Sequence, residues 1–249
     1  MLKVSNLSVS YGDLKIVSDV SFSLSEGDWL MLAGPNGAGK STILGAIGGG
    51  IPCRGVVTWD GRSLLTMKGK ERAALLGTLR QNHFVSYGFT VSQVVRLGRY
   101  AFGHNDPEGP RAVEEALSLV GLWEKRHQIV TTLSGGELQR TFLAQLLAQN
   151  PKVLLLDEPA NHLDLVYQKQ VFSLVDEWRR QPGRAVLSVV HDLSLARRYG
   201  SRALLLDRGH TVALGPVEEA LGETRLNSVY GLDVGAWMRD LYAQWENRT

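Results

Sequence analysis

The sequence predicts an α/β fold that combines a parallel sheet, an antiparallel β subdomain and an inserted α-helical subdomain. Three observations lead to this prediction. Short apolar runs near residues 29–33, 153–156 and 185–190 have the continuous hydrophobicity of strands that are buried on both faces of a parallel sheet. The first 24 residues instead repeat apolar side chains every two or three positions, as antiparallel strands do. Between about residues 81 and 132, helical spacing replaces both patterns.

The N-terminal region predicts two strands on either side of a turn at residues 11–13. Their apolar residues are Leu2, Val4, Leu7, Ile16, Val20, Phe22 and Leu24. The apolar run at 29–33 then predicts a buried strand, which the glycine-rich segment 34–39 interrupts. Helical spacing follows over 41–47 until three consecutive glycines end it.

The middle and the end of the chain predict helices separated by further strands. One helix is indicated around 91–97 and another around 112–120, and the linker 103–110 between them holds two prolines and two glycines. Strand signals return at 153–156, 185–190 and 203–206. We therefore expect one domain over 1–249, with an α/β and β core at 1–80 and 150–249, a helical subdomain at 81–135 and a helical C-terminal tail at 217–249.

Composition restricts the class of protein. The 249 residues include 27 basic and 25 acidic ones, a net charge of +2, which is too near balance to indicate a nucleic-acid partner. The single cysteine, Cys53, excludes an intrachain disulfide, and no Cys/His cluster indicates a metal site. No run approaches the ~18 apolar residues of a membrane span, and residues 1–10 lack a secretory apolar block. We expect a soluble protein of the cytosol.

Residues 34–41 fit the phosphate-binding pattern G-x-x-x-x-G-K-[ST] between a predicted strand and a predicted helix. Glycines let backbone N–H groups converge on phosphate oxygens, and the helix N-terminus adds its positive dipole end. In this pattern the lysine contacts the β- and γ-phosphates. The serine or threonine that follows the lysine contacts Mg²⁺ through its hydroxyl group. The candidate ATP-binding residues here are Gly34, Pro35, Asn36, Gly37, Ala38, Gly39, Lys40, Ser41 and Thr42.

Two carboxylates, Asp157 and Glu158, follow the apolar run at 153–156. Open α/β sheets bind their ligands at the carboxyl ends of the strands. Asp157 is therefore suited to Mg²⁺, and Glu158 to the general base that activates water, a role typically worth ~10²–10⁴ in rate. We expect the chain to bind and hydrolyse a nucleoside triphosphate.

A second anion-binding helix end is indicated by Ser134, Gly135, Gly136 and Glu137. Ser134 and Glu137 form an S-x-x-E capping box, and the two glycines between them leave backbone amides uncovered. One nucleotide needs only one phosphate loop. The second helix end therefore suggests a nucleotide held by another copy of the chain.

Together with the phosphate loop and the acidic strand end, the segment Leu-Ser-Gly-Gly-Glu-Leu-Gln-Arg at 133–140 closely resembles the signature of the ATP-binding cassette (ABC) ATPase family. The resemblance covers nearly the whole chain and implies a P-loop NTPase core. It also implies a head-to-tail dimer in which Ser134, Gly135, Gly136 and Glu137 close over the ATP of the opposing subunit. Glu137 stands where glutamine is common.

The resemblance assigns four further residues. Tyr11 matches the aromatic residue that stacks on adenine, and Gln81 matches the Q-loop glutamine that reaches Mg²⁺ and the attacking water. Asp164 matches the D-loop aspartate that contacts the partner subunit. His191 matches the switch histidine, which holds the γ-phosphate and Glu158 in place.

Three weaker signals are similar to importers of iron–siderophore, haem and cobalamin: Leu97-Gly98-Arg99-Tyr100, residues 161–164, and Tyr230-Gly231-Leu232. Residues 127–132 lack the acidic glycine segment that many exporters carry before the signature. The resemblance then implies a peripheral ATPase at the cytoplasmic face of the cell membrane, two permease subunits and, indirectly, an extracytoplasmic binding protein. Two alternatives remain: a non-transport ABC scaffold in cofactor assembly or translation, and an unrelated P-loop switch.

Overall fold

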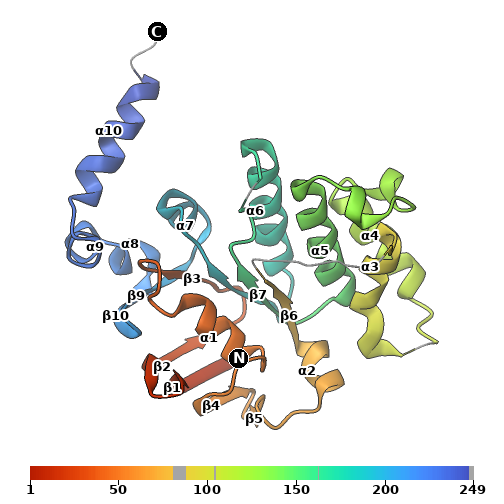
Figure 1. Cartoon of the computed structure of the whole chain (residues 1–249), viewed down its shortest axis with the longest axis horizontal. Coiled ribbons are helices and arrows are strands. Elements are labelled where there is room, and N and C mark those ends of the chain that lie inside the picture. The colour runs from red at the N-terminus through yellow and green to blue at the C-terminus, as the bar shows by residue number, and fades with distance from the viewer. Residues whose placement is uncertain (81–87, 104, 162, 247–249) are drawn as a thin grey trace.

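The computed structural model describes residues 1–80, 88–103, 105–161 and 163–246, and these form two sheets with helices around them (Figure 1). The smaller sheet has the order β2-β1-β4-β5 and the larger one the order β10-β9-β3-β8-β7-β6. The combination of mixed sheets and helices confirms the predicted α/β class.

The smaller sheet is antiparallel throughout. Its first hairpin, in which Tyr11 faces Leu14, is the one that the N-terminal pattern predicts. The two other strands follow helix α1 (Lys40–Ile47) and were not predicted from the sequence. The strands are β1 (Leu2–Tyr11), β2 (Leu14–Leu24), β4 (Arg54–Trp59) and β5 (Arg62–Ser63).

The larger sheet is parallel except for its antiparallel edge strand β10. Every residue of β3 and β8 is buried, as the continuous apolar runs predicted. The pattern did not reveal β6, which is only four residues long, or β10, which is mostly exposed and ends in Gly-Pro. The strands are β3 (Trp29–Ala33), β6 (Leu76–Leu79), β7 (Val153–Asp157), β8 (Ala185–Val189), β9 (Arg202–Asp207) and β10 (His210–Pro216).

Helices cover both faces of the larger sheet. Helix α1 (Lys40–Ile47) lies between the two sheets, in contact with β1, β2, β7 and β8, and it buries Ile43, Leu44 and Ile47 there. On the other face, α6 (Leu165–Arg179) and α7 (Leu193–Tyr199) contribute Phe172 and Tyr199, which pack on Trp29 of β3. The parallel pairings of β3 with β8 and of β8 with β7 place the carboxyl ends of these three strands at one edge of the sheet.

A helical group lies at one side of the molecule (Figure 1). Its central helix α5 packs against α3, α4 and η1, and also against β6. A capping box at Thr90 starts α3, and a part-buried ion pair at 2.6 Å joins Arg99 of η1 to Asp106, which lies just before α4. Helix α5 joins this group to the sheet. The predicted end of the helical subdomain at residue 135 therefore stays a prediction. The elements are α2 (Gly69–Leu75), α3 (Val91–Leu97), η1 (Gly98–Phe102), α4 (Gly109–Leu119), η2 (Trp123–Lys125), η3 (Val130–Thr132) and α5 (Gly135–Gln149).

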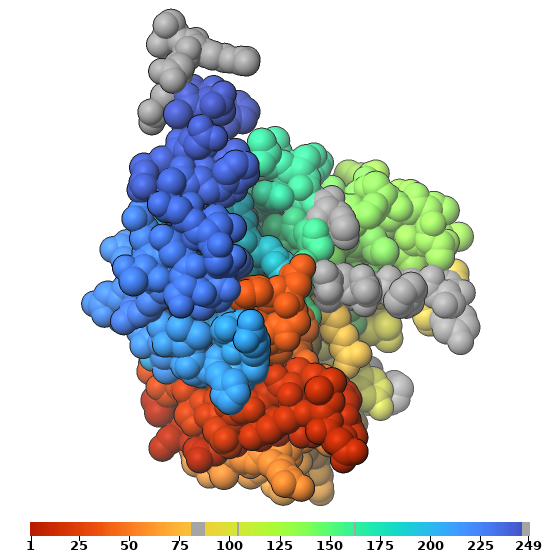
Figure 2. Space-filling model, turned by 60° about the vertical axis from the view of Figure 1, so that its left-hand side comes forward, coloured from red at the N-terminus to blue at the C-terminus, as the bar shows by residue number. Residues whose placement is uncertain are grey.

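The C-terminal tail is helical and consists of α8 (Val217–Ala220), α9 (Glu223–Tyr230) and α10 (Val234–Glu246). Helix α8 contacts β9 and β10, whereas α10 projects from the side of the molecule opposite α3 and α4 (Figure 1). Figure 2 shows the tail on one flank, above the N-terminal sheet. Among the described residues, no helix has the length and apolar character needed to cross a membrane.

Candidate functional site

The loop between β3 and α1 has the backbone that the phosphate-binding pattern requires. Gly34 has a φ of +140°, and a Cβ there would lie 2.2 Å from the carbonyl oxygen of Leu206, so no other residue fits. Gly39 caps α1 with a φ of +96°. The predicted strand–loop–helix context is therefore confirmed, and the uncovered amides at the start of α1 face the cleft as an anion-binding site.

Lys40 is almost fully buried at the start of α1. Its Nζ donates hydrogen bonds to the carbonyl oxygens of Gly34 and Pro35, at 2.7 and 2.8 Å. Burial lowers the pKa of Lys40, and the nearby charges of Glu158 and Asp157 oppose this effect. Burial deprives the ammonium of hydration, and an anion that enters the cleft would compensate for this loss, so Lys40 is placed to bind phosphate.

Ser41 and Asp157 form the second contact of the site, because Ser41 Oγ donates a hydrogen bond of 3.0 Å to the Asp157 carboxylate. Burial raises the pKa of Asp157, and the hydrogen bond from Ser41 acts in the opposite direction. A hydroxyl and a carboxylate are hard oxygen ligands, of the kind that Mg²⁺ uses together with substrate phosphates. Within the described ranges, no cluster of three His, Cys, Asp or Glu side chains offers a site made of protein ligands alone.

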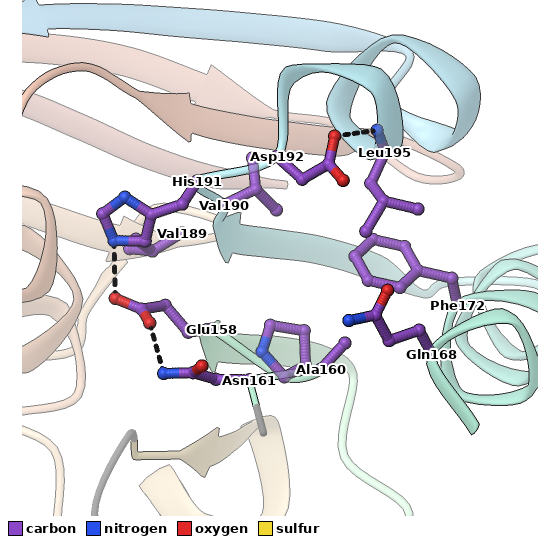
Figure 3. A pocket seen from close by; sticks show the side chains of 11 residues that line it. Glu158, Ala160, Asn161, Gln168, Phe172, Val189, Val190, His191, Asp192 and Leu195 are labelled. Carbon is purple, nitrogen blue, oxygen red and sulfur yellow. Dashed lines mark hydrogen bonds and ion pairs between the residues drawn. The ribbon is translucent and has the colours of Figure 1, made fainter. Parts of the chain in front are cut away.

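Glu158 and His191 meet at the carboxyl ends of β7 and β8. Because these strands are neighbours, with Asp157 opposite Val189, Glu158, one residue after β7, and His191, two residues after β8, lie at the same edge of the sheet. His191 Nε2 is 2.6 Å from Glu158 Oε1, and Figure 3 shows this contact. Glu158 also has a φ of +51°, a left-handed conformation that is costly for a residue with a side chain and is found preferentially at functional sites.

The cleft in front of these residues has a volume of about 680 Å³. Tyr11, half exposed at the tip of the β1–β2 hairpin, forms its outer wall. The sequence did not indicate Ile16, which also lines the cleft. The lining residues are Tyr11, Ile16, Asn36, Gly37, Ala38, Gly39, Lys40, Ser41, Thr42, Glu158 and His191. The structure therefore brings Tyr11, residues 36–42, Glu158 and His191 together in one cleft, whereas Gly34, Pro35 and Asp157 are not among its lining residues.

The signature residues lie elsewhere, at the start of α5. Ser134 Oγ accepts a hydrogen bond of 3.3 Å from the backbone of Glu137, and Glu137 Oε2 accepts one of 2.9 Å from the backbone of Ser134. This reciprocal pair is the predicted capping box. The hydrogen bond from Lys125, followed by that from the Ser134 backbone, lowers the pKa of Glu137 to about 2. Among the residues that the structure describes, 134–137 are not part of the cleft wall.

The remaining assigned residues are placed differently. Asp164 accepts a hydrogen bond of 3.0 Å from the backbone of Tyr167 and caps α6 at an exposed position. Gln81 lies outside the described residues. Tyr230, from the tail, is half-buried beside the backbone of Gly34. Local sequence gives no signal for this last proximity, because nearly 200 residues separate the two positions.

Comparisons with known proteins place these features in context. The family model described as "ABC transporter" matches residues 17–161. A hemin import ATP-binding protein of Pseudomonas aeruginosa is 40% identical, and the alignment covers 94% of each chain. An iron(3+)-hydroxamate import ATP-binding protein of Bacillus subtilis is 34% identical, over 93% of this chain and 88% of that one.

Two further comparisons concern length and assembly. An uncharacterized ABC transporter ATP-binding protein of Bacillus subtilis is 37% identical, and the alignment covers 94% of this chain. The same alignment covers 54% of the relative, so this chain spans about half of that protein's length. A solved cassette described as a dimeric post-hydrolysis state bound to ADP and Pi aligns with a TM-score of 0.80 at 26% identity. That alignment covers 87% of this chain and 99% of the cassette.

Proposed function

Because this chain belongs to the ABC transporter family, we propose that it is the ATP-hydrolysing subunit of an importer and drives uptake through a separate membrane permease. The observation that carries this proposal is the cleft in which Tyr11, Lys40, Ser41, Glu158 and His191 converge. It contains a wall for adenine, a loop for phosphate and a carboxylate for water activation. The import functions of the similar proteins support the direction of transport.

The chain's own residues divide the work of hydrolysis. The amides of the loop 34–39 and the Lys40 ammonium bind the β- and γ-phosphates, and the ring of Tyr11 stacks on the base. Ser41, Asp157 and Gln81 would hold Mg²⁺, which would neutralise phosphate charge when bound. Glu158 accepts a proton from the attacking water, and His191, in contact with it at 2.6 Å, fixes its carboxylate beside the phosphate.

A second copy of the chain completes each site. The uncovered amides at Gly135 and Gly136 form an anion-binding helix end that does not line the chain's own cleft. In the proposed head-to-tail dimer, these amides contact the γ-phosphate held by the other copy, and Asp164 contacts that copy as well. The dimeric state of the similar solved cassette supports this arrangement.

The helical group offers a docking site for the permease. A groove of about 370 Å³ runs between α2, α3 and η1, with exposed Leu97 and Tyr100 on its wall and the cations Lys70 and Arg96 beside them. We expect a cytoplasmic segment of the permease with apolar and acidic side chains to bind here. Because α3 and η1 pack against α5, movement of that segment would reach Ser134 at the start of α5. The chain then works at the cytoplasmic face of the membrane.

The cargo class follows from the similar proteins rather than from the cleft. The two import proteins are named for hemin and iron(3+)-hydroxamate, so we propose haem or an iron–siderophore as cargo, delivered by an extracytoplasmic binding protein. Cobalamin, the third cargo that the sequence resemblance implies, stays a prediction.

Reconstitution tests the proposal. The chain is co-purified with the multi-span permease expected to be encoded beside it and is placed in liposomes with haem or a ferric hydroxamate. ATP hydrolysis that rises with the cargo and its binding protein is the expected result. A chain that hydrolyses ATP but assembles only with soluble proteins would instead indicate the non-transport scaffold.

A further inference from the structure

Both carboxylate oxygens of Glu158 have a side-chain partner. Oε1 is 2.6 Å from His191 Nε2, and Oε2 accepts a hydrogen bond of 2.9 Å from the side-chain amide of Asn161. Figure 3 shows Glu158 between these two residues, which approach from different elements. His191 follows β8, whereas Asn161 lies in the turn after β7.

The turn that carries Asn161 is held on several sides. The Asn161 backbone N–H donates to the carbonyl of Glu158 at 3.1 Å, so the turn returns the amide side chain to the same glutamate. Gln139 of α5 donates to the carbonyl of Pro159 at 3.1 Å. Ala160 and Leu163 on either side are buried. The amide of Asn161 is therefore presented to Glu158 by a fixed backbone.

Two partners constrain a carboxylate in a way that one does not. The last torsion of a glutamate side chain is broad and roughly two-fold, so a single hydrogen bond to one oxygen leaves rotation about the contact. A second donor on the other oxygen removes that freedom and leaves only the remaining lone pairs for a water proton. Glu158 and His191 line both the phosphate cleft and the smaller cavity of about 150 Å³ that Asn161 also lines.

We infer that Asn161 is a positioning residue: its amide holds the second oxygen of Glu158 and, with His191, sets the direction in which that carboxylate faces the cleft. The inference rests on the proposed function, because it gives Asn161 a role only if Glu158 is the base. It also gives the turn a link to the signature helix, because Gln139 of α5 contacts the same turn.

The test uses Asn161→Ala, Asn161→Asp and Glu158→Gln in the full chain, with Gln170→Ala, an exposed amide on α6, as the matched control. Turnover, ATP affinity and the pH dependence of kcat are measured for each, and thermal unfolding verifies folding. Asn161→Ala should lower kcat about 10- to 100-fold, the range expected when a reacting group is misplaced by about 1 Å. ATP affinity should stay within about twofold, because Asn161 contacts the carboxylate and not the phosphate loop.

The isosteric Asn161→Asp separates positioning from packing. It places a second carboxylate beside Glu158, and a like charge raises the pKa of its neighbour. Because a base works only when deprotonated, the acidic limb of the kcat profile should move to higher pH in this variant and much less in Asn161→Ala.

The outcomes distinguish the inference from the function on which it rests. If Glu158→Gln abolishes turnover while both Asn161 variants keep kcat and the pH profile, the role of Asn161 is wrong and the base stands. Equal losses in both variants without a shift of the acidic limb would show that the amide serves packing, and would also overturn the inference. If Glu158→Gln itself keeps full turnover, the proposed base is wrong.

Discussion

The hydroxyl of Ser41 donates a hydrogen bond of 3.0 Å to the carboxylate of Asp157, and this contact joins the first turn of α1 to the end of β7. It holds the start of α1, directly after the loop 34–39, against the strand that Glu158 follows. The two proposed oxygen ligands for Mg²⁺ thereby lie beside the proposed catalytic base, although they are more than 100 residues apart in the sequence.

Replacing Asp157 with asparagine should raise the Mg²⁺ concentration needed for half-maximal ATP hydrolysis by about 10- to 100-fold, the usual effect of removing a partner that supports a metal site. The amide keeps the shape and the contact with Ser41 but loses the charge. Titration of activity with MgCl₂ at fixed ATP measures the change. Asp176→Asn on α6 would be a poor control, because it breaks two ion pairs. Asp240→Asn on α10 is the suitable control. An unchanged Mg²⁺ requirement in Asp157→Asn would contradict the proposed role of Asp157 in binding Mg²⁺.

Replacing Lys40 with alanine should weaken ATP binding about 10- to 100-fold, the loss expected when a charge-assisted contact to phosphate is removed. Folding should be retained, because the buried ammonium is desolvated and its removal relieves that cost. Fluorescence titration with an ATP analogue gives the affinity, and the exposed Lys169→Ala on α6 is the matched control. Equal affinities in the two variants would count against the phosphate loop.

The ion pair between Glu137 and Lys125 predicts a pH-dependent contribution to stability. The pKa of Glu137 is about 2 in the folded protein, below the value of about 4.3 for an unperturbed glutamate. A lowered pKa means that the contribution is complete above about pH 4.3 and is lost as the pH falls towards 2. Urea unfolding from pH 7 to pH 3 should therefore show a deficit for Glu137→Gln that shrinks with acid.

The exposed Glu114→Gln on α4 serves as the control for this measurement. It should differ little from the unmodified chain at any of these pH values. A deficit of Glu137→Gln that is the same at pH 7 and pH 3 would mean that the carboxylate charge does not support the start of α5.

Local chemistry explains which parts of the fold and site the sequence could predict. The loop around Lys40 and the capping box at Ser134 are formed by neighbouring residues, so their spacing alone indicates them. The buried strands β3, β7 and β8 are also indicated by local sequence, because each contains a continuous run of apolar residues. The ABC ATPase resemblance then supplied roles for Tyr11 and His191, whose contacts depend on distant segments.

The features that the sequence did not indicate depend on tertiary pairing. Strand β6 is four residues long and β10 is an exposed edge, so neither carries a periodic signal. The hydrogen bond from Asn161 to Glu158 spans only three positions, yet an asparagine in a turn is common. Its role became apparent only once β7 and β8 had placed Glu158 against His191.

The sedimentation of Glu158→Gln with and without Mg–ATP tests most directly the central claim that each nucleotide site is shared by two copies of the chain. The variant keeps the phosphate loop and the signature helix end but lacks the base, so bound ATP should hold the closed dimer together. We expect its sedimenting mass to double with Mg–ATP and to remain that of one chain without it. An unmodified chain that stays monomeric at saturating Mg–ATP, while it hydrolyses ATP at a rate per molecule independent of protein concentration, would contradict the account.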